Sequence, residues 1–343
     1  MENKKQTILI TGAYGFVGQN LSLALKNNYN LWALDIVEKP TDTYTRFFTW
    51  DDLNNIPKVD AIIHLAGKAH DTKNQTDRQV YFDINTTLTQ KIYDWFLNSE
   101  AEKFIFFSSV KAAADKVEGI LTEDVVPCPK GPYGESKIKA EEYLLKSQES
   151  RTKNKEQRTK IKEDREENKE QGEETRNTKP EMQKSYILRP CMIHGPGNKG
   201  NLNLLYNFVK KNIPWPLGAY ENKRSFTAID NLTYIIQQLL EKDIESATYN
   251  VCDDESISTN ELISLFSQAL NKPVKIWKIN KILIQFTAKL GSLFHLPLNE
   301  ERLHKLTENY VVSNSKIKKQ LGITELPVKA NEGILKTIKN FIN

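Results

Sequence analysis

Three residues have side chains that could transfer a proton together. Tyr133 and Lys137 lie four residues apart, and Ser109 ends the apolar run KFIFFSS, 24 residues before the tyrosine. A lysine one helical turn from a phenol, together with a positively charged hydride acceptor, favours the phenolate. Such a phenol can take a proton from an alcohol while hydride leaves the same carbon. These residues therefore predict redox chemistry at an alcohol carbon, provided that a hydride acceptor lies beside them.

A second tyrosine–lysine pair has the same spacing but a different setting. Tyr206 and Lys210 lie on an amphipathic stretch with no strand-ending serine suitably ahead of it, which favours a core-packing helix. Tyr133 instead opens a helix after a proline-rich turn, and Ser109 ends a predicted central strand. Open α/β sheets bind ligands at that edge. A surface pair on an exposed helix remains the alternative interpretation of Tyr133 and Lys137.

Glycines near the start of the chain predict a dinucleotide site. The apolar run 6–10 is typical of a buried strand, and the segment TGAYGFVG follows it. Gly12 allows a tight turn, Gly15 lets backbone N–H groups approach a pyrophosphate, and Gly18 permits close packing of a helix on the strand. The GxxGxxG spacing differs from the usual GxGxxG, and the glycines alone would also suit an ordinary strand–turn–helix connection.

An acidic residue supports the dinucleotide interpretation. Asp35 ends the next apolar run, 31–35, and lies 17 residues after Gly18. A carboxylate at this place accepts hydrogen bonds from a ribose 2′-hydroxyl and repels a 2′-phosphate. The expected cofactor is therefore NAD rather than NADP.

Together, these motifs resemble the extended short-chain dehydrogenase/reductases, in particular the NAD-dependent epimerase/dehydratase group that acts on nucleotide sugars. The resemblance covers about residues 6–325, apart from one insertion. The segments that carry it are TGAYGFVG (11–18), Asp35, Asp51 to Leu53, His64 to Gly67, Asn85, SSV (108–110), YGESK (133–137), RPCMIHGPGNKGN (189–201), Arg224 to Phe226 and Asp230 to Leu232.

The resemblance implies a role for each matching residue. The catalytic residues would be Ser109, Tyr133 and Lys137. NAD would be held by Gly12, Tyr14, Gly15, Phe16, Val17, Gly18, Asp35, Asp52, Leu53, Leu65, Ala66, Gly67, Lys68, Asn85, Tyr133 and Lys137. The substrate would contact Ser109, Lys111, Asn201, Arg224 and Arg302, although the local motif around Arg302 matches the family pattern less well. The two arginines would bind the diphosphate, because guanidinium groups suit this anion. No metal site is expected, since His64 and His194 lack metal-ligand spacing and are better explained by local hydrogen bonds.

Departures from the family pattern narrow the expected activity. Met192 stands where many members carry a substrate-contacting asparagine, and His194 replaces a tyrosine. Val110 and Lys111 follow Ser109 where 4,6-dehydratases carry Asp-Glu, so dehydration is not expected. The resemblance favours a 4-epimerase of a UDP-hexose or UDP-N-acetylhexosamine in surface-polysaccharide sugar synthesis. The alternatives are an NAD(P)H-dependent 4-ketoreductase of a 4-keto-6-deoxy sugar and a cofactor-binding scaffold without catalysis.

Strand-like runs alternate with helical patterns along the chain. Runs at 60–66, 104–108, 186–188 and 248–252 predict an α/β fold, namely a Rossmann doubly wound parallel sheet with a smaller, interleaved C-terminal substrate lobe. The NAD-binding domain is expected over 1–190. The substrate lobe, with late Rossmann elements, is expected over 191–343.

Two segments stand apart from this pattern. Residues 147–184 hold 11 Lys/Arg and 10 Asp/Glu and hardly any aliphatic side chain, so a charged insertion is expected, as a solvated helix or a mobile loop. A partner-binding role for it is possible, but inert expansion is favoured. The stretch 281–294 is apolar on one side. A core or lobe-packing helix is favoured there over contact with a membrane surface.

Composition excludes several kinds of partner. The net charge of +4 is made of interspersed signs, so nucleic-acid binding is not expected. The three cysteines show no paired spacing, which predicts a reducing compartment and a cytoplasmic location. Neither a secretory signal nor a membrane span is expected. The family resemblance implies a homodimer formed through the helix of Tyr133.

Overall fold

The computed structural model describes residues 5–69, 77–166, 183–198, 202–294 and 299–342, with the backbone alone for 154–166. Asn201 and part of the predicted insertion, 167–182, lie outside the described residues. The chain forms two compact units that interleave in sequence. The first unit comprises Met1–Gly18, Leu25–Asp115 and Pro127–Ile187, and the second comprises Gln19–Ala24, Lys116–Val126 and Leu188–Asn343.

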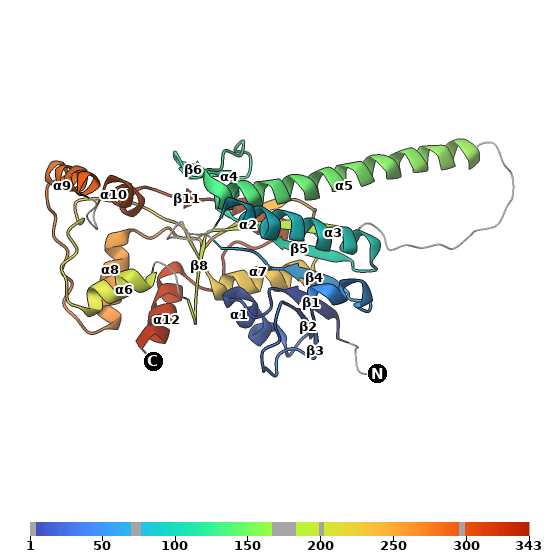
Figure 1. Ribbon diagram of the computed structural model, residues 1–343, viewed down its shortest axis with the longest axis horizontal. Helices are drawn as coiled ribbons and strands as arrows, with labels where there is room; N and C mark the ends of the chain where they lie inside the picture. Colours follow the sequence, from blue (N-terminus) through green and yellow to red (C-terminus); the bar gives the residue numbers. More distant parts are fainter. Residues whose placement is uncertain (1–4, 70–76, 167–182, 199–201, 295–298, 343) are drawn as a thin grey trace. The chain divides into compact units, whose positions relative to one another are not determined.

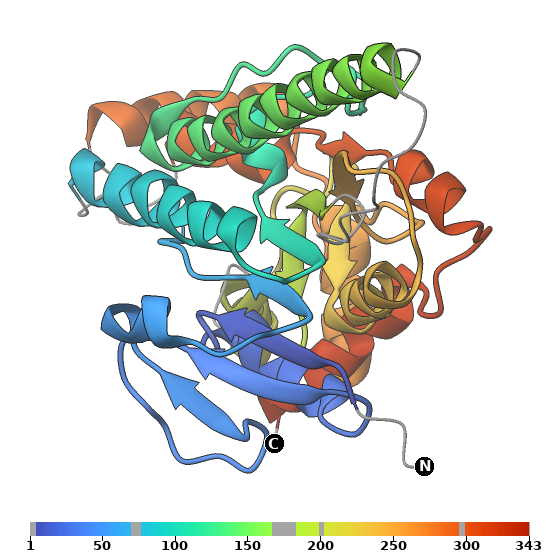
Figure 2. The ribbon, with the colours of Figure 1, turned by 90° about the vertical axis from the view of Figure 1, so that its right-hand side faces the viewer.

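A seven-stranded sheet carries the fold, and its strand order is β10-β7-β5-β4-β1-β2-β3 (Figure 1). Neighbouring strands of the first unit pair in parallel, β1 with β2 and β4, β2 with β3, and β4 with β5. Figure 2 shows the blue strands of this unit side by side. The strands are β1 (Thr7–Thr11), β2 (Asn30–Leu34), β3 (Arg46–Phe48), β4 (Ala61–His64), β5 (Lys103–Phe107), β7 (Lys184–Pro190) and β10 (Thr248–Val251). The predicted doubly wound parallel sheet is confirmed.

Helices of the first unit connect these parallel strands, as crossover connections require. They are the 3₁₀ turn Trp50–Asn55, α2 (Arg78–Phe82), the π-helical turn Asp83–Thr87, α3 (Leu88–Asn98), α4 (Val110–Ala113) and α5 (Gly131–Glu166). Helix α1 (Phe16–Leu25) follows β1, but its residues Gln19–Ala24 belong to the second unit. Every residue of β1 is buried, as expected for a central strand covered on both faces.

Aromatic packing fixes α3 and α5 in the first unit. Phe104 of β5 contacts Tyr93 and Phe96 of α3, with ring centroids 5.1 and 5.2 Å apart. Ala140 and Leu144 of α5 are buried in the same core. Rings at these separations stabilise a core beyond the area that they bury. The helix that carries Tyr133 is therefore anchored two turns after the tyrosine.

Helix α5 does not end where the predicted insertion begins. It continues as one helix to Glu166, so residues 147–166 take the first of the two expected forms, a charged helix. A helix without an apolar stripe gains little from packing and depends on solvent and on neighbouring charges.

The second unit is mainly helical and has its own core. Its elements are β6 (Ile120–Leu121), β8 (Met192–His194), α6 (Leu202–Lys210), β9 (Phe226–Ala228), α7 (Ile229–Glu241), α8 (Thr259–Ala269), α9 (Lys281–Leu293), α10 (Glu300–Thr307), β11 (Val311–Val312), α11 (Ser315–Leu321) and α12 (Ala330–Ile342). Tyr206 is buried in this core, which confirms the core-packing interpretation of the second tyrosine–lysine pair. Among the described helices of both units, none combines the length and hydrophobicity that a bilayer crossing needs.

His64 has a structural role at the end of β4. Its Nδ1 lies 2.6 Å from Thr11 Oγ1 and its Nε2 lies 2.9 Å from Thr89 Oγ1, and the ring is fully buried. The interpretation of His64 as a residue with local hydrogen bonds is confirmed. Burial, and secondarily the charge of Lys137, lowers the pKa of His64 from 6.5 to about 3.

We expect His64 to make the protein sensitive to mild acid. The unfolded chain binds a proton at this histidine below pH 6.5, whereas the folded chain does not until about pH 3. The stability that depends on the neutral ring is therefore present above pH 6.5 and is lost as the pH falls. Between pH 7 and pH 5 this lowers the free energy of unfolding by about 2 kcal/mol. Denaturant titrations at both pH values should show a smaller difference for His64→Gln, and an equal difference would contradict the assignment.

Candidate active site

The glycine turn joins β1 to α1. Gly12 has a φ of +65°, and its N–H donates to Leu34 O over 3.0 Å. A Cβ on Gly12 would lie 2.7 Å from the backbone nitrogen of Ala66, and a Cβ on Gly18 would lie 2.4 Å from Ala13 O. Phe16 and Val17 form the first turn of α1 directly after Gly15. The turn is thus packed too closely for any side chain at Gly12 or Gly18.

Asp35 follows β2 and holds the same turn. Its Oδ2 accepts the Tyr14 N–H over 3.0 Å, and its Oδ1 accepts the Ile36 N–H over 2.8 Å. Each carboxylate oxygen can accept a further hydrogen bond, so a ribose hydroxyl can still be bound. Sequence reasoning missed Tyr44, whose hydroxyl donates to Ala13 O over 2.9 Å and so braces the turn from outside.

Basic residues lie near this end of the first unit. A depression there is lined by Tyr14, Lys39, Tyr44 and Arg46, among others. The Lys39 ammonium lies 5.9 Å from the centre of the Tyr14 ring. Burial raises the pKa of the Tyr14 phenol. Glu38 also lines this depression, which adjoins Asp35 through Tyr14.

The segment after β4 forms the next part of the predicted NAD site. Leu65 N–H donates to Thr11 O and Ala66 N–H donates to Thr11 Oγ1, both over 3.1 Å. Asn85 Oδ1 accepts the Lys68 N–H over 2.8 Å. The Asn85 amide also donates to Ser136 Oγ over 3.0 Å. The buried Asn85 thus ties this segment to α5.

The predicted NAD contacts Asp52 and Leu53 have partners within the protein. Asp52 Oδ2 accepts the Thr49 N–H over 2.8 Å and the Thr49 hydroxyl over 2.7 Å, and these bonds lower the pKa of Asp52. The Leu53 side chain is buried in the core of the first unit. These contacts fix the 3₁₀ turn that follows β3.

Ser109, Tyr133 and Lys137 come together within the first unit. Ser109 caps α4, where its Oγ accepts the Lys111 N–H over 3.2 Å. Its hydroxyl proton is then available for the oxygen of Tyr133, to which Ser109 is hydrogen-bonded. This bond lowers the pKa of Tyr133, but burial has the larger effect and raises it. The pKa of Tyr133 is therefore raised in the free protein, because burial of the phenol outweighs the bond from Ser109.

Lys137 is buried one turn after Tyr133. Its Nζ donates to Phe107 O over 2.8 Å and lies 5.0 Å from the centre of the Phe106 ring. A Cβ on Gly67 would lie 3.0 Å from the same nitrogen, so the ammonium lies beside the predicted cofactor segment. Burial lowers the pKa of Lys137 to about 8, and the carboxylate of Glu141 opposes this shift.

Glu141 is a residue that sequence reasoning missed. It is fully buried, and it accepts a hydrogen bond from Ser108. It lies four residues after Lys137 on α5, so Tyr133, Lys137 and Glu141 follow one face of the helix at successive turns. The recurring spacing of four was the signal that could have indicated it.

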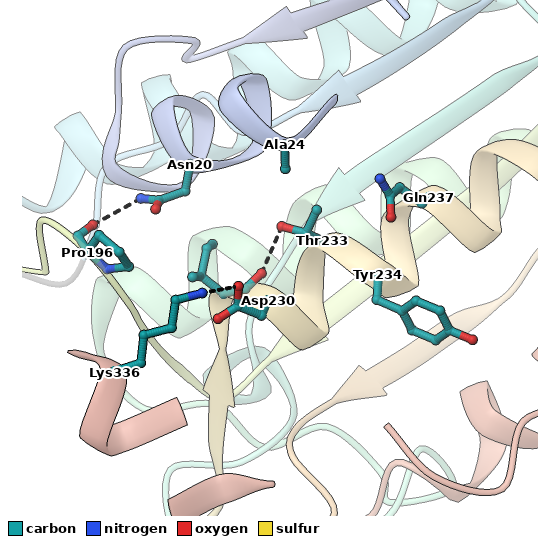
Figure 3. A pocket seen from close by; sticks show the side chains of 9 residues that line it. Asn20, Ala24, Pro196, Asp230, Thr233, Tyr234, Gln237 and Lys336 are labelled. Atoms are coloured by element: carbon teal, nitrogen blue, oxygen red, sulfur yellow. Dashed lines mark hydrogen bonds and ion pairs between the residues drawn. The ribbon is translucent and has the colours of Figure 1, made fainter. Parts of the chain in front are cut away.

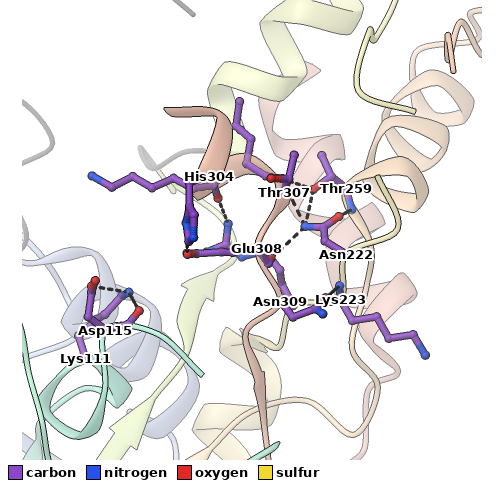
Figure 4. A network of polar contacts seen from close by, with 12 residues as sticks. Lys111, Asp115, Asn222, Lys223, Thr259, His304, Thr307, Glu308 and Asn309 are labelled. Atoms are coloured by element: carbon purple, nitrogen blue, oxygen red, sulfur yellow. Dashed lines mark hydrogen bonds and ion pairs between the residues drawn. The ribbon is translucent and has the colours of Figure 1, made fainter. Parts of the chain in front are cut away.

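The predicted substrate residues Lys111 and Arg224 have partners of their own, and Figure 4 shows the partner of Lys111. In the first unit, Lys111 Nζ donates to Asp115 O over 2.9 Å and to its carboxylate over 3.1 Å. In the second unit, Arg224 donates to Lys305 O over 2.7 Å, and its guanidinium lies 3.5 Å from Glu308. Glu308, which the sequence did not indicate, is thus the counter-ion of Arg224, the residue predicted to bind the diphosphate.

The other predicted substrate ligands are placed less specifically. Arg302 is exposed in the first turn of α10, where its N–H donates to Asn299 Oδ1 over 2.9 Å. Asn201 lies outside the described residues. A depression on the second unit, lined by Asn20, Asp230 and Lys336 among others, contains none of the residues predicted to bind ligands (Figure 3).

Two buried polar pairs in the second unit are structural. His194 Nδ1 lies 2.9 Å from Thr337 Oγ1, and its Nε2 lies 3.5 Å from Asp253. Cys191 and Cys252 are hydrogen-bonded neighbours, and burial followed by this contact raises the pKa of the Cys191 thiol. Within the residues that the structure describes, no group of three or more potential ligands could hold a metal ion.

A family model accounts for the part of the chain that contains these residues. Residues 8–155 match the model described as NAD dependent epimerase/dehydratase family. They form a domain of this family. The match includes the glycine turn, Asp35, Asn85, Ser109, Tyr133 and Lys137. The predictions of the family, of an NAD-dependent enzyme and of NAD as its cofactor are confirmed.

Relatives of the epimerase/dehydratase domain extend over almost the whole chain. The UDP-glucose 4-epimerase of Vibrio cholerae is 28% identical over 98% of this chain and 96% of its own length. The dTDP-4-dehydro-6-deoxyglucose reductase of Escherichia coli is 26% identical over 80% of this chain and 85% of its own length. The crystal structure of UDP-glucuronic acid 4-epimerase from Bacillus cereus in complex with NAD has a TM-score of 0.67 and 20% identity, and the match covers 98% of each chain. This structural likeness shows the same fold.

Proposed function

We propose that the protein is a nucleotide-sugar 4-epimerase that acts on a UDP-hexose or a UDP-N-acetylhexosamine. This proposal rests on one observation: Ser109, Tyr133 and Lys137 meet beside the segment after β4, residues 65–68. The Vibrio cholerae relative, which is named a UDP-glucose 4-epimerase, supports a UDP-sugar substrate. Surface-polysaccharide sugar synthesis is the setting that we propose for this reaction.

The residues present fit a bound NAD. The glycine turn offers backbone N–H groups at the start of α1, and an added side chain at Gly67 would meet Asn85 and Lys137. Asp35 would accept the adenosine ribose hydroxyls, and Lys137 would hold the nicotinamide ribose. The remaining predicted contacts, from Tyr14 to Asn85, would complete the site. When bound, NAD would accept a hydride from C4 of the sugar and return it to the opposite face.

Tyr133 would move the proton that accompanies this hydride. Its phenolate oxygen would take the proton of the C4 hydroxyl and return it after the keto sugar has turned over. Ser109 would donate to the same oxygens and hold the sugar in register. The pKa of Tyr133 is raised in the free protein, so the positive charges of bound NAD and of Lys137 must lower it before Tyr133 can act as a base.

Lys137 would supply part of that positive charge. With a pKa of about 8, it is mostly protonated at neutral pH, and Glu141 supports the charged form. The substrate would be bound by Lys111, Arg224, Arg302 and Asn201. The two arginines would contact its diphosphate. For Arg224 this requires that the diphosphate compete with Glu308 for the guanidinium.

The E. coli relative, which is named a reductase, favours a second candidate, a 4-ketoreductase that uses the same residues in one direction. Incubation with UDP-glucose or UDP-GlcNAc and no added nicotinamide separates the two. An epimerase forms the C4 epimer, visible by NMR, without net oxidation. A reductase instead consumes NADH stoichiometrically with a 4-keto sugar nucleotide, and that result without epimer formation would overturn the epimerase proposal.

We expect Asp35→Asn to weaken the preference for NAD over NADP. The amide oxygen can still accept the Tyr14 N–H, but the charge that repels a 2′-phosphate is gone, and Lys39 and Arg46 lie nearby. The ratio of the Kd for NADP to the Kd for NAD should fall by about tenfold or more. Titration calorimetry measures both constants. Asp42→Asn removes an equal charge from an exposed pair in the same unit and should leave the ratio unchanged.

Two further predictions remain proposals. We propose a homodimer formed through the Tyr133 helix, supported by the family resemblance, and light scattering of the purified protein tests it.

We also propose a cytoplasmic location. The free thiols of Cys128, Cys191 and Cys252 are compatible with a reducing compartment.

A further inference from the structure

Helix α9 of the second unit has two apolar faces. Its buried residues are Ile284, Ala288 and Gly291, and the first two belong to the core of that unit. Ile282, Leu283, Phe286, Leu290, Leu293 and the following Phe294 are exposed; we call these six residues the α9 stripe. At about 100° per residue, the stripe falls on the side opposite to the buried face. Lobe packing therefore explains only one side of α9.

The stripe is a continuous row of large exposed side chains. Ile282 is 75% exposed, Leu293 69% and Phe294 65%. Single exposed apolar side chains are common, whereas a contiguous row on one helix marks an interaction surface. A helix that is apolar on opposite sides is suited to lie between a protein core and a second apolar phase.

The segment that carries the stripe has charges of one sign, although Glu300 of α10 contacts Ser292 of α9. Residues 271–294 contain five lysines and no aspartate or glutamate. Of these lysines, Lys278, Lys281 and Lys289 are exposed. A helix with an exposed apolar face and lysines beside it binds in the plane of a membrane surface, and each lysine adds attraction to anionic lipid headgroups.

An exposed tryptophan precedes the helix. Trp277 is 56% exposed, although its backbone is fixed by hydrogen bonds with Trp215 and Gly218. Val274, three residues earlier, is also exposed. Tryptophan is enriched where protein meets the headgroup region, because its ring is amphipathic. The segment before α9 thus carries the same chemistry as the stripe.

We propose that α9 and residues 274–278 bind the surface of a membrane that contains anionic lipids. The stripe enters the boundary between headgroups and acyl chains, and the lysines contact the lipid phosphates. A second copy of this chain is a poorer occupant, since a symmetric contact would oppose one cluster of five lysines with another. The proposal goes beyond the sugar-nucleotide reaction and does not depend on it.

Sedimentation of the full-length protein with vesicles tests this surface. We expect binding to vesicles of phosphatidylcholine with about one third phosphatidylglycerol, weaker binding to phosphatidylcholine alone, and loss of binding at high salt. The triple variant Ile282→Ser, Phe286→Ser and Leu293→Ser should lower the partition coefficient by about tenfold or more. Leu204→Ser with Val126→Ser is the control, because both side chains are exposed and apolar but lie elsewhere in the second unit.

A charge variant provides a second, independent measurement. Lys278→Glu, Lys281→Glu and Lys289→Glu together should abolish the preference for anionic vesicles. The tryptophan emission of the parent protein should shift to the blue on binding, and Trp277→Phe should lose most of that shift. Thermal unfolding of each variant shows that the second unit is folded.

Two outcomes would overturn the proposal. One is equal sedimentation of the parent protein with anionic and zwitterionic vesicles, or of the stripe variant and the parent. The other is a change of oligomeric state in the stripe variant, measured by light scattering, while vesicle binding is absent from the parent. The second outcome would assign the stripe to a contact between copies of the chain.

Discussion

Replacement of Tyr133 by phenylalanine is expected to lower kcat by about a thousandfold, because general acid–base catalysis contributes factors of this size. The phenylalanine ring retains the packing against Tyr81, whose ring centroid lies 6.5 Å from that of Tyr133. The variant loses only the oxygen that is bonded to Ser109. Its thermal stability and its affinity for NAD should therefore stay close to those of the parent protein, and epimer formation followed by NMR measures the loss.

The chain contains a matched control for this experiment. Tyr206 and Lys210 have the same spacing as Tyr133 and Lys137, but Tyr206 lies in the core of the second unit. Tyr206→Phe should keep kcat within a few fold of the parent value. If Tyr133→Phe keeps full turnover, the phenol is not the base. If both variants lose activity equally, the effect is one of folding and not of proton transfer.

The second large effect is expected at Gly12, where an alanine would be forced into two conflicts at once. The φ of +65° strains a residue with a Cβ, and that Cβ would lie 2.7 Å from the Ala66 nitrogen, which is backbone and cannot move aside cheaply. We expect Gly12→Ala to lower the free energy of unfolding by about 3 kcal/mol and to abolish measurable NAD binding. Denaturant titration and calorimetry with NAD are the measurements.

Two other glycines separate the causes of this effect. Gly119 has a φ of +76° but nothing within 4 Å of an added Cβ, so Gly119→Ala measures backbone strain alone, about 1 kcal/mol. Gly15 lies in the same turn as Gly12, and its added Cβ would meet only Gly12 O at 3.2 Å. Gly15→Ala should leave the fold intact but weaken NAD binding. Equal loss of stability in all three variants would refute the close approach of Gly12 to the segment after β4.

The sequence predicted those features that depend on chain order. The strand that ends at Ser108 and the helix that begins near Tyr133 were evident from apolar runs and a proline-rich turn. Parallel strands present their carboxyl ends at one edge, so the meeting of Ser109 with Tyr133 followed from the predicted sheet. The glycine turn and Asp35 were recognisable for the same reason.

The features that depend on packing were not predictable in this way. Glu141 resembles the other acidic residues of α5, and only the folded chain shows that it is buried against Ser108. Cys191 and Cys252 are distant in sequence and become neighbours because β7 and β10 are adjacent in the sheet. The raised pKa of Tyr133 in the free protein was not foreseen, since the extent to which a phenol is desolvated cannot be inferred from its spacing to a lysine.

The π-helical turn Asp83–Thr87 constrains how related sequences can differ in length. A π turn accommodates one residue more than the α-helix on either side of it. Deletion of a single residue here would leave a regular helix, and the later residues of α3 would keep their orientation around the axis. Tyr93 and Phe96 would then stay in the core, but the turn that places the Asn85 amide beside Ser136 would be lost. A one-residue gap at this point in a homologue would therefore signal a different amide position beside Ser136 while the packing of α3 is retained.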